Sequence, residues 1–96
     1  MKYFFLRLNP PRPTFSQDMT PEERGVMQRH VAYWTDLMGK GAVLVFGPVL
    51  DPRGTYGIGV IGVESESERD TFMANDPANG LLRYECHDMR AVVPGT

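Results

Sequence analysis

The stretch 20–41 constrains this chain most, because the sequence encodes the start, the buried face and the end of one long helix. Thr20 can cap the first turn, a proline follows at the first helical position, and Glu23 completes a capping box. Gly39 and Gly41 supply the stop. An apolar stripe runs along the expected helix and contains Met27, Val31, Trp34, Leu37 and Met38. The rest of the chain is therefore expected to cover that stripe.

His30 lies inside this stripe, so an ionisable ring points toward the body of the protein rather than toward water. Two interpretations are open. The ring can be that of a core histidine whose two nitrogens bond to backbone groups. It can also transfer protons, provided that a second polar residue fixes its tautomer.

Strand patterns occur on both sides of this helix. Residues 2–8 alternate aromatic and branched side chains and predict a first strand. Residues 42–50 and 55–63 are apolar runs joined by the turn sequence Asp-Pro-Arg-Gly, and they predict an antiparallel hairpin. Residues 81–93 predict a long last strand that carries Leu82, Tyr84 and Cys86 on one face.

A second helix is predicted over residues 65–75, where Ser65 and Glu68 form another capping box and Pro77 ends the segment. The order is then β-α-β-β-α-β. This is the order of the ferredoxin-like α+β fold, a four-stranded antiparallel sheet with both helices on one face. A chain of 96 residues fits one domain, 1–96.

The expected sheet is too apolar for two helices to cover all of it. Its apolar and aromatic residues include Val43, Val45, Tyr56, Ile58 and Tyr84. Because a large exposed apolar surface marks an interface, we expect a second copy of the chain to cover the other face. The expected assembly is a homodimer.

Prolines dominate the loop between the first strand and the long helix, residues 9–19. Pro10, Pro11 and Pro13 predict an extended segment without regular pairing, with Phe15 as its one large apolar anchor. The loop can serve as a lid, or it can be a surface connector with Phe15 packed against the body.

The charge balance argues against two classes of partner. Ten basic and twelve acidic residues give a net charge of −2, and the arginines are scattered, so we expect neither nucleic acid nor a membrane as partner. The apolar run at the N-terminus is too short for a signal sequence or a spanning helix. The single cysteine, Cys86, excludes an internal disulfide and fits a reducing compartment, so we expect a cytoplasmic protein.

Residues 57–62 carry the letters of a dinucleotide-binding G-x-G-x-x-G motif, but they lie within a predicted strand and no helix begins at the third glycine. We therefore reject a dinucleotide site. Gly57 and Gly59 share one strand face, and their missing side chains leave room for a helix, a partner strand or a ligand.

Cys86, His87 and Asp88 resemble a set of metal ligands only in their letters. Consecutive strand residues point to opposite faces, so Cys86 and His87 cannot bind one ion. We expect no metal and no cofactor.

Asp76 is the strongest candidate partner for His30, since Pro77 holds it at the end of the second helix. In the ferredoxin-like plan the two helices lie side by side, so Asp76 can bond one ring nitrogen and leave the other free to move a proton. The alternative is an ordinary turn residue.

The sequence resembles the YCII-related (YciI-like) family of the dimeric α/β barrel superfamily. The resemblance rests on the aromatic first strand, Arg29-His30, GAVLVFGP at 41–48, Asn75-Asp76-Pro77 and Val93-Pro94. It implies that His30 and Asp76 form an active-site dyad. Where the family usually has an aromatic residue after the Asp-Pro pair, this chain has Ala78, and its loop 9–19 is longer.

The resemblance also implies a function, since a few relatives are dehydrochlorinases of chlorinated aromatic compounds. The expected activity is that of a cofactor-free lyase or isomerase, in which His30 moves a proton of a small ring compound and Asp76 orients the imidazole. Expected substrate contacts are Trp34, Phe15 and Arg83, with Tyr84 as an alternative donor. A non-catalytic small-molecule-binding or interaction module is the other possibility.

Overall fold

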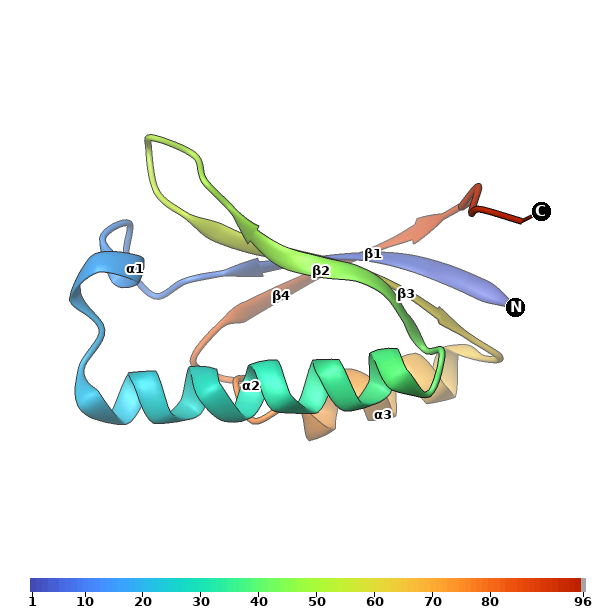
Figure 1. The fold of residues 1–96 in the computed structure, drawn as a ribbon, viewed down its shortest axis with the longest axis horizontal. Helices are drawn as coiled ribbons and strands as arrows, with labels where there is room; N and C mark the ends of the chain where they lie inside the picture. Colours follow the sequence, from blue (N-terminus) through green and yellow to red (C-terminus); the bar gives the residue numbers. More distant parts are fainter. Residues whose placement is uncertain (96) are drawn as a thin grey trace.

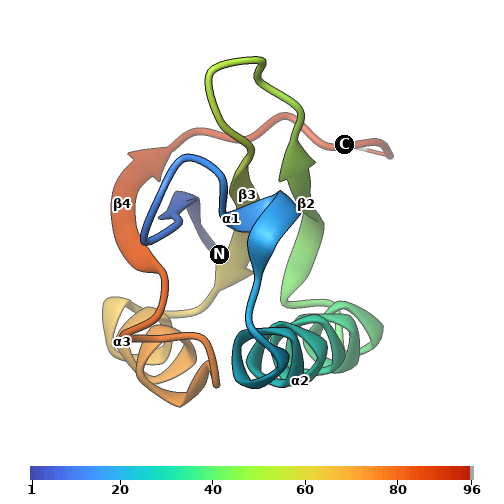
Figure 2. The ribbon, with the colours of Figure 1, turned by 90° about the vertical axis from the view of Figure 1, so that its left-hand side faces the viewer.

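The computed structural model describes residues 1–95 and shows four strands and three helices in the expected order, with one short helix added. The strands form one antiparallel sheet in the order β2-β3-β1-β4, and α2 and α3 lie side by side on one of its faces (Figure 1, Figure 2). This is the predicted ferredoxin-like α+β fold. The elements are β1 (Lys2–Asn9), α1 (Phe15–Asp18), α2 (Pro21–Gly39), β2 (Val43–Val49), β3 (Tyr56–Val63), α3 (Glu66–Asn75) and β4 (Arg83–Met89).

The start of α2 is confirmed. The Thr20 side chain accepts from the Glu23 amide at 3.1 Å, and the Glu23 carboxylate accepts from the Thr20 amide at 2.9 Å, which completes the capping box. The full capping box predicted for α3 is wrong. Ser65 accepts from the Glu68 amide, but the Glu68 carboxylate accepts from the amide of Glu64, one residue earlier than the box requires.

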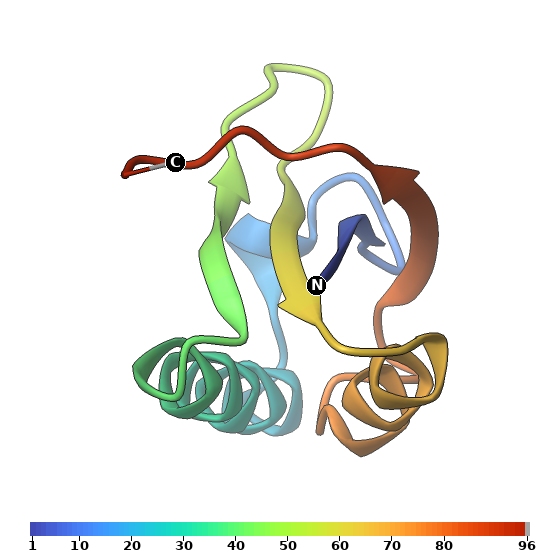
Figure 3. The ribbon, with the colours of Figure 1, turned by 90° about the vertical axis from the view of Figure 1, so that its right-hand side faces the viewer.

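The last strand is shorter than the predicted 81–93. β4 is an edge strand whose one neighbour is β1, and the pairing runs only from Asn9↔Arg83 to Tyr3↔Met89. Beyond Met89 the short first strand offers no further partner for the ladder, so the strand ends there. The chain then crosses on the side of the sheet away from the helices (Figure 3).

The loop before α2 is not wholly extended, because residues 15–18 form the single helical turn α1. Its cause is local: the Thr14 carbonyl accepts from the amides of Gln17 and Asp18, and the Thr14 hydroxyl donates to the Asp18 carboxylate at 2.6 Å. This turn carries Phe15 into the interior, where it is buried.

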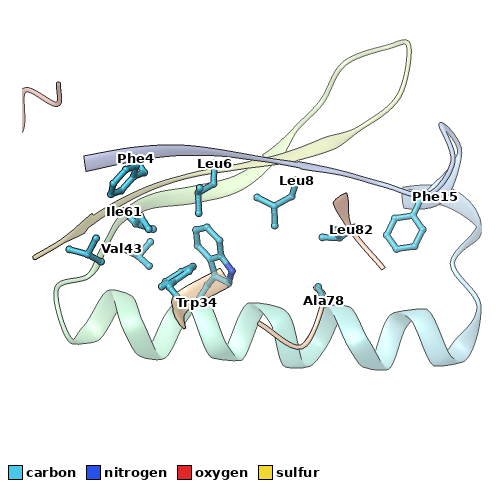
Figure 4. Packing of buried hydrophobic residues seen from close by; sticks show 11 residues of the cluster. Phe4, Leu6, Leu8, Phe15, Trp34, Val43, Ile61, Ala78 and Leu82 are labelled. Carbon is cyan, nitrogen blue, oxygen red and sulfur yellow. The ribbon is translucent and has the colours of Figure 1, made fainter. Parts of the chain in front are cut away.

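Trp34 fills the centre of the core between α2 and the sheet (Figure 4). A Cβ atom added at Gly59 would lie 2.1 Å from its ring, so the glycine permits the helix side chain to approach the strand. The Phe72 ring meets the indole edge-on at a centroid distance of 4.8 Å. The sequence left a helix, a partner strand or a ligand as possible neighbours of this glycine face, and at Gly59 the neighbour is helix α2.

The apolar stripe of α2 is narrower than predicted. His30 and Trp34 are buried, whereas Val31 is 49% and Met38 37% exposed. Each of these two residues follows a more buried one, so the rotation of about 100° per residue carries it toward the edge of the buried face.

The opposite sheet face is also apolar. The register places Phe5, Ile58 and Val60 there, together with Val45, which is 51% exposed. Among the described helices, none is long and apolar enough to cross a membrane.

Candidate active site

Asp76 is fixed at the C-terminal end of α3 by its own local hydrogen bonds. It is the C-cap residue, in an extended conformation that suits a residue before proline. Its Oδ1 atom accepts from the Ala78 amide at 2.8 Å, and its carbonyl accepts from the Asn79 amide at 3.0 Å. These bonds close a turn around Pro77 and hold the carboxylate in place.

The two predicted dyad residues meet. His30 Nδ1 lies 2.9 Å from Oδ1 and 2.8 Å from Oδ2 of Asp76, although 46 residues separate them in the chain. Their side chains are 9% and 0% exposed. His30 Nδ1 is thus bonded to a side chain rather than to a backbone group, and Asp76 both closes its turn and contacts the imidazole.

Two further donors reach the same carboxylate. Trp34 Nε1 donates to Oδ2 at 2.9 Å, and the Tyr84 hydroxyl donates to Oδ2 in a short hydrogen bond. Sequence reasoning missed both bonds. Trp34 lies one helical turn after His30 and Tyr84 lies on the helix-facing side of β4, which are the only sequence signals that could have indicated them.

These donors decide the charge of the carboxylate. Burial acts to raise the pKa of Asp76, but the hydrogen bonds from His30, Tyr84, the Ala78 amide and Trp34 hold that pKa below its ordinary value. Burial and the adjacent Asp76 carboxylate raise the pKa of Tyr84, so its hydroxyl remains a donor. Asp76 is therefore an ionised acceptor with every oxygen occupied.

An ionised carboxylate accepts hydrogen bonds only, so His30 Nδ1 carries a proton, and in the neutral form of the ring the lone pair is on Nε2. Nε2 bonds to no protein group within residues 1–95. In that same range no buried side-chain nitrogen or oxygen lacks a partner, so Nε2 is accessible. This nitrogen is therefore available to a bound molecule.

His30 lines a cavity of about 450 Å³ between α1, α2 and the β2–β3 hairpin. The wall is mostly apolar and includes Phe15, Met27, Trp34, Phe46 and Leu82. Its polar lining residues besides His30 and Trp34 are Ser16, Thr55 and Tyr56, and no Lys, Arg, Asp or Glu within the described range lines it. A cavity of this size and composition suits a small, largely apolar molecule.

The predicted substrate contacts divide into two groups. Phe15 and Trp34 line the cavity, while Arg83 lies exposed on the other sheet face and is absent from the lining, so we do not retain it. Tyr84 binds Asp76 rather than facing the cavity as a substrate donor. Ala78, which stands where relatives have an aromatic residue, is fully buried.

Cys86 and His87 point to opposite sides of the sheet. Cys86 packs against the helix-facing core and burial raises the pKa of its thiol, whereas the His87 ring lies 6.3 Å from that of Phe5 on the other face. Over residues 1–95 no group of three or more His, Cys, Asp and Glu side chains could hold a metal ion.

Comparisons with known proteins agree with this fold. The family model of the YCII-related domain matches residues 1–90. No curated protein sequence matches the chain. Among nine matching chains of solved structures is 5-chloro-2-hydroxyhydroquinone dehydrochlorinase (TftG) from Burkholderia phenoliruptrix AC1100, in complex with 2,5-dihydroxybenzoquinone. It is 25% identical with a TM-score of 0.64, and the alignment covers 91% of this chain and 93% of that chain. The likeness assigns the fold to the dimeric α/β barrel class.

Proposed function

Because this chain belongs to the YCII-related domain family, we propose that it is a lyase or isomerase in which His30 transfers a proton of a small ring compound. One observation carries the proposal. Asp76 holds the proton on Nδ1 of His30, so the accessible Nε2 atom presents a lone pair at the cavity.

The site supports the proton transfer in two ways. Nε2 accepts a proton from an O–H or C–H bond of the bound ring, and the positive imidazolium that forms lies against the Asp76 carboxylate. Both members are buried, which strengthens their attraction. General acid–base groups typically contribute about 10²–10⁴-fold to a rate.

In the lyase form of the reaction, electrons and atoms balance without another reactant. Nε2 takes the proton, the electron pair left behind forms a new double bond in the ring, and a leaving group such as chloride departs with its bonding pair. In the isomerase form, the imidazolium returns the proton to a different ring atom. The solved relative, a dehydrochlorinase, favours the lyase form.

The test is turnover of chlorinated hydroxyhydroquinones and ring lactones, followed by chloride release and by absorbance. We expect activity in the unaltered protein, and a loss of about 10²-fold or more in His30→Gln. His87→Gln is the matched control, because His87 lies on the other sheet face and is expected to leave the rate unchanged. A fully active His30→Gln variant would contradict the proposal.

The second candidate is a module that binds such molecules without reacting with them. The wall favours it in one respect: besides His30, the described lining contains no ionised side chain at neutral pH. Binding detected by thermal shift, without turnover of any bound compound, would select this candidate.

We also propose that the chain forms a homodimer through the sheet face opposite the helices. Phe5, Ile58 and Val60 lie on that face, and α2 and α3 leave it uncovered. Sedimentation at micromolar concentration should show twice the monomer mass. Val45→Glu, at a half-exposed position on the same face, should yield a folded monomer, and a parent protein that sediments as a monomer would refute the dimer.

A further inference from the structure

We propose that Tyr84 is a positioning residue of the site, whose hydroxyl acts through Asp76 to weaken the hold of the carboxylate on the His30 proton. The inference extends the proposed function and rests on it for its catalytic meaning. It concerns a residue on β4 that does not line the cavity.

The contacts assign this role. Asp76 Oδ2 accepts from the Tyr84 hydroxyl, from Trp34 Nε1 at 2.9 Å and from His30 Nδ1 at 2.8 Å, so three side-chain donors share one oxygen. The Tyr84 backbone pairs with β1 opposite Leu8, and its side chain packs against the core cluster. The Tyr84 hydroxyl is therefore positioned by strand β4, whereas the His30 imidazole is positioned by helix α2.

The direction of the effect follows from the charges. A hydroxyl that donates to Oδ2 places its positive hydrogen beside the carboxylate and lowers the negative potential that His30 Nδ1 experiences. Less negative potential favours the neutral imidazole over the imidazolium. Removing the Tyr84 hydroxyl should therefore strengthen the attraction between Asp76 and a protonated His30 ring.

Other groups near the imidazole do not compete for this role. Tyr33 on α2 donates its hydroxyl to the Phe72 carbonyl at 2.8 Å, and Tyr56 reaches the cavity from β3. Asp76 is the one carboxylate bonded to the ring within the described range. Tyr33→Phe therefore removes a hydroxyl near the site without removing a donor to Asp76.

The experiment is an NMR titration of the His30 ring in the parent, Tyr84→Phe and Tyr33→Phe proteins. We expect Tyr84→Phe to raise the titration midpoint by roughly 0.5–1 pH unit, and Tyr33→Phe to leave it in place. The alkaline shift should reappear in the pH–rate profile of any substrate that turns over. A midpoint in Tyr84→Phe that equals the parent's, or falls below it, would overturn the proposal.

A second measurement needs no variant. With ¹³C-labelled tyrosine, the Tyr84 ring should keep the chemical shift of a neutral phenol at pH 11, where an ordinary tyrosine, with a pKa of about 10, has ionised. Ionisation of Tyr84 at that ordinary value would refute its bond to the carboxylate. Neither readout requires turnover, so a shifted midpoint without any reaction would refute the proposed function alone.

Discussion

Asp76 in the interior and Glu23 nearer the surface are two carboxylates whose oxygens all accept hydrogen bonds. Glu23 accepts from both terminal nitrogens of Arg12, at 3.0 and 2.7 Å, and from the Thr20 amide. Asp76 accepts from neutral indole and phenol groups and from His30. Both carboxylates therefore have hydrogen bonds on each oxygen, but they differ in their donors and in their surroundings.

The pKa values move in the same direction at both positions. Bonds from Arg12 and from the Thr20 amide lower the pKa of Glu23 to about 2, and the donors around Asp76 lower its pKa against the opposing effect of burial. Water can replace the partners of Glu23 but not those of Asp76, so the same hydrogen bonds carry different energetic weight. Burial, rather than the direction of the pKa shift, therefore distinguishes the Asp76 carboxylate from the Glu23 carboxylate.

The largest effect is expected from Asp76→Ala, which leaves the indole and phenol donors buried without an acceptor. The free energy of unfolding should fall by roughly 3–5 kcal/mol, measured by urea denaturation. Asp36→Ala is the control, since that side chain is 65% exposed in its pair with Lys40. Equal losses in the two variants would mean that the buried Asp76 contributes no more to the free energy of unfolding than the exposed Asp36.

Gly59→Ala should disrupt, from the sheet side, the interior cluster of side chains that donate hydrogen bonds to Asp76. The new methyl group would lie 2.1 Å from the Trp34 ring and would push the indole away from Asp76, at a cost of about 1–3 kcal/mol. Urea denaturation measures the loss, and His30 ring signals should shift with it. Gly47→Ala is matched to it, because an added Cβ there meets nothing within 4 Å. A Gly59→Ala protein as stable as Gly47→Ala would contradict the packing.

Lowering the pH should also distinguish the contributions of Asp76 and Glu23 to the free energy of unfolding. The pKa of Asp76 is lower in the folded than in the unfolded chain, so its stabilising contribution is present above the unfolded value of about 3.9. That contribution is lost as the pH falls through the folded value. We expect unfolding free energy to decline below about pH 4 in the parent, to decline slightly less in Glu23→Gln because solvent weakens the Glu23 contacts, and to decline least in Asp76→Asn. A decline of the same size in all three proteins would assign it to other groups.

The sequence predicted the local features of the fold well. Thr20 and Glu23 define the start of α2 because a capping box needs only neighbours in the chain. The dyad followed from His30 on a buried face and Asp76 before a proline, once the helices were taken to lie side by side. The capping box was contained in one short segment, whereas the dyad needed two distant segments and the expected arrangement of the helices.

The predictions from sequence failed where residues far apart in the chain determine the structure. The end of β4 depends on the length of β1, and the bond from Tyr84 to Asp76 depends on the position of the strand relative to the end of α3. Arg83 was predicted as a substrate contact although it alternates with Tyr84 and so faces away from the helices. The α1 turn was missed because the neighbouring prolines outweighed the bonds of Thr14 to Asp18.

The smallest effect is expected at the surface ion pairs of Arg12 with Asp18 and Glu23, which hold α1 and which we call the latch. Arg12 bridges Asp18, at the end of α1, and Glu23, in the first turn of α2. Arg12→Gln should change global stability little, because ion pairs that solvent still reaches contribute little, but it should loosen the turn. Hydrogen exchange at the amides of Phe15, Gln17 and Asp18 should then accelerate by about two- to five-fold.

Salt should imitate that substitution in the parent protein, since exposed pairs are screened at 1 M ionic strength while buried ones are screened much less. We expect faster exchange in α1 at high salt and an unchanged His30 titration beside Asp76. Lys40→Gln, which removes an exposed pair at the other end of α2, controls for a general loss of charge. If salt moved the His30 titration as much as it moved exchange in α1, water would reach both carboxylates, and the distinction between the interior cluster and the latch would fail.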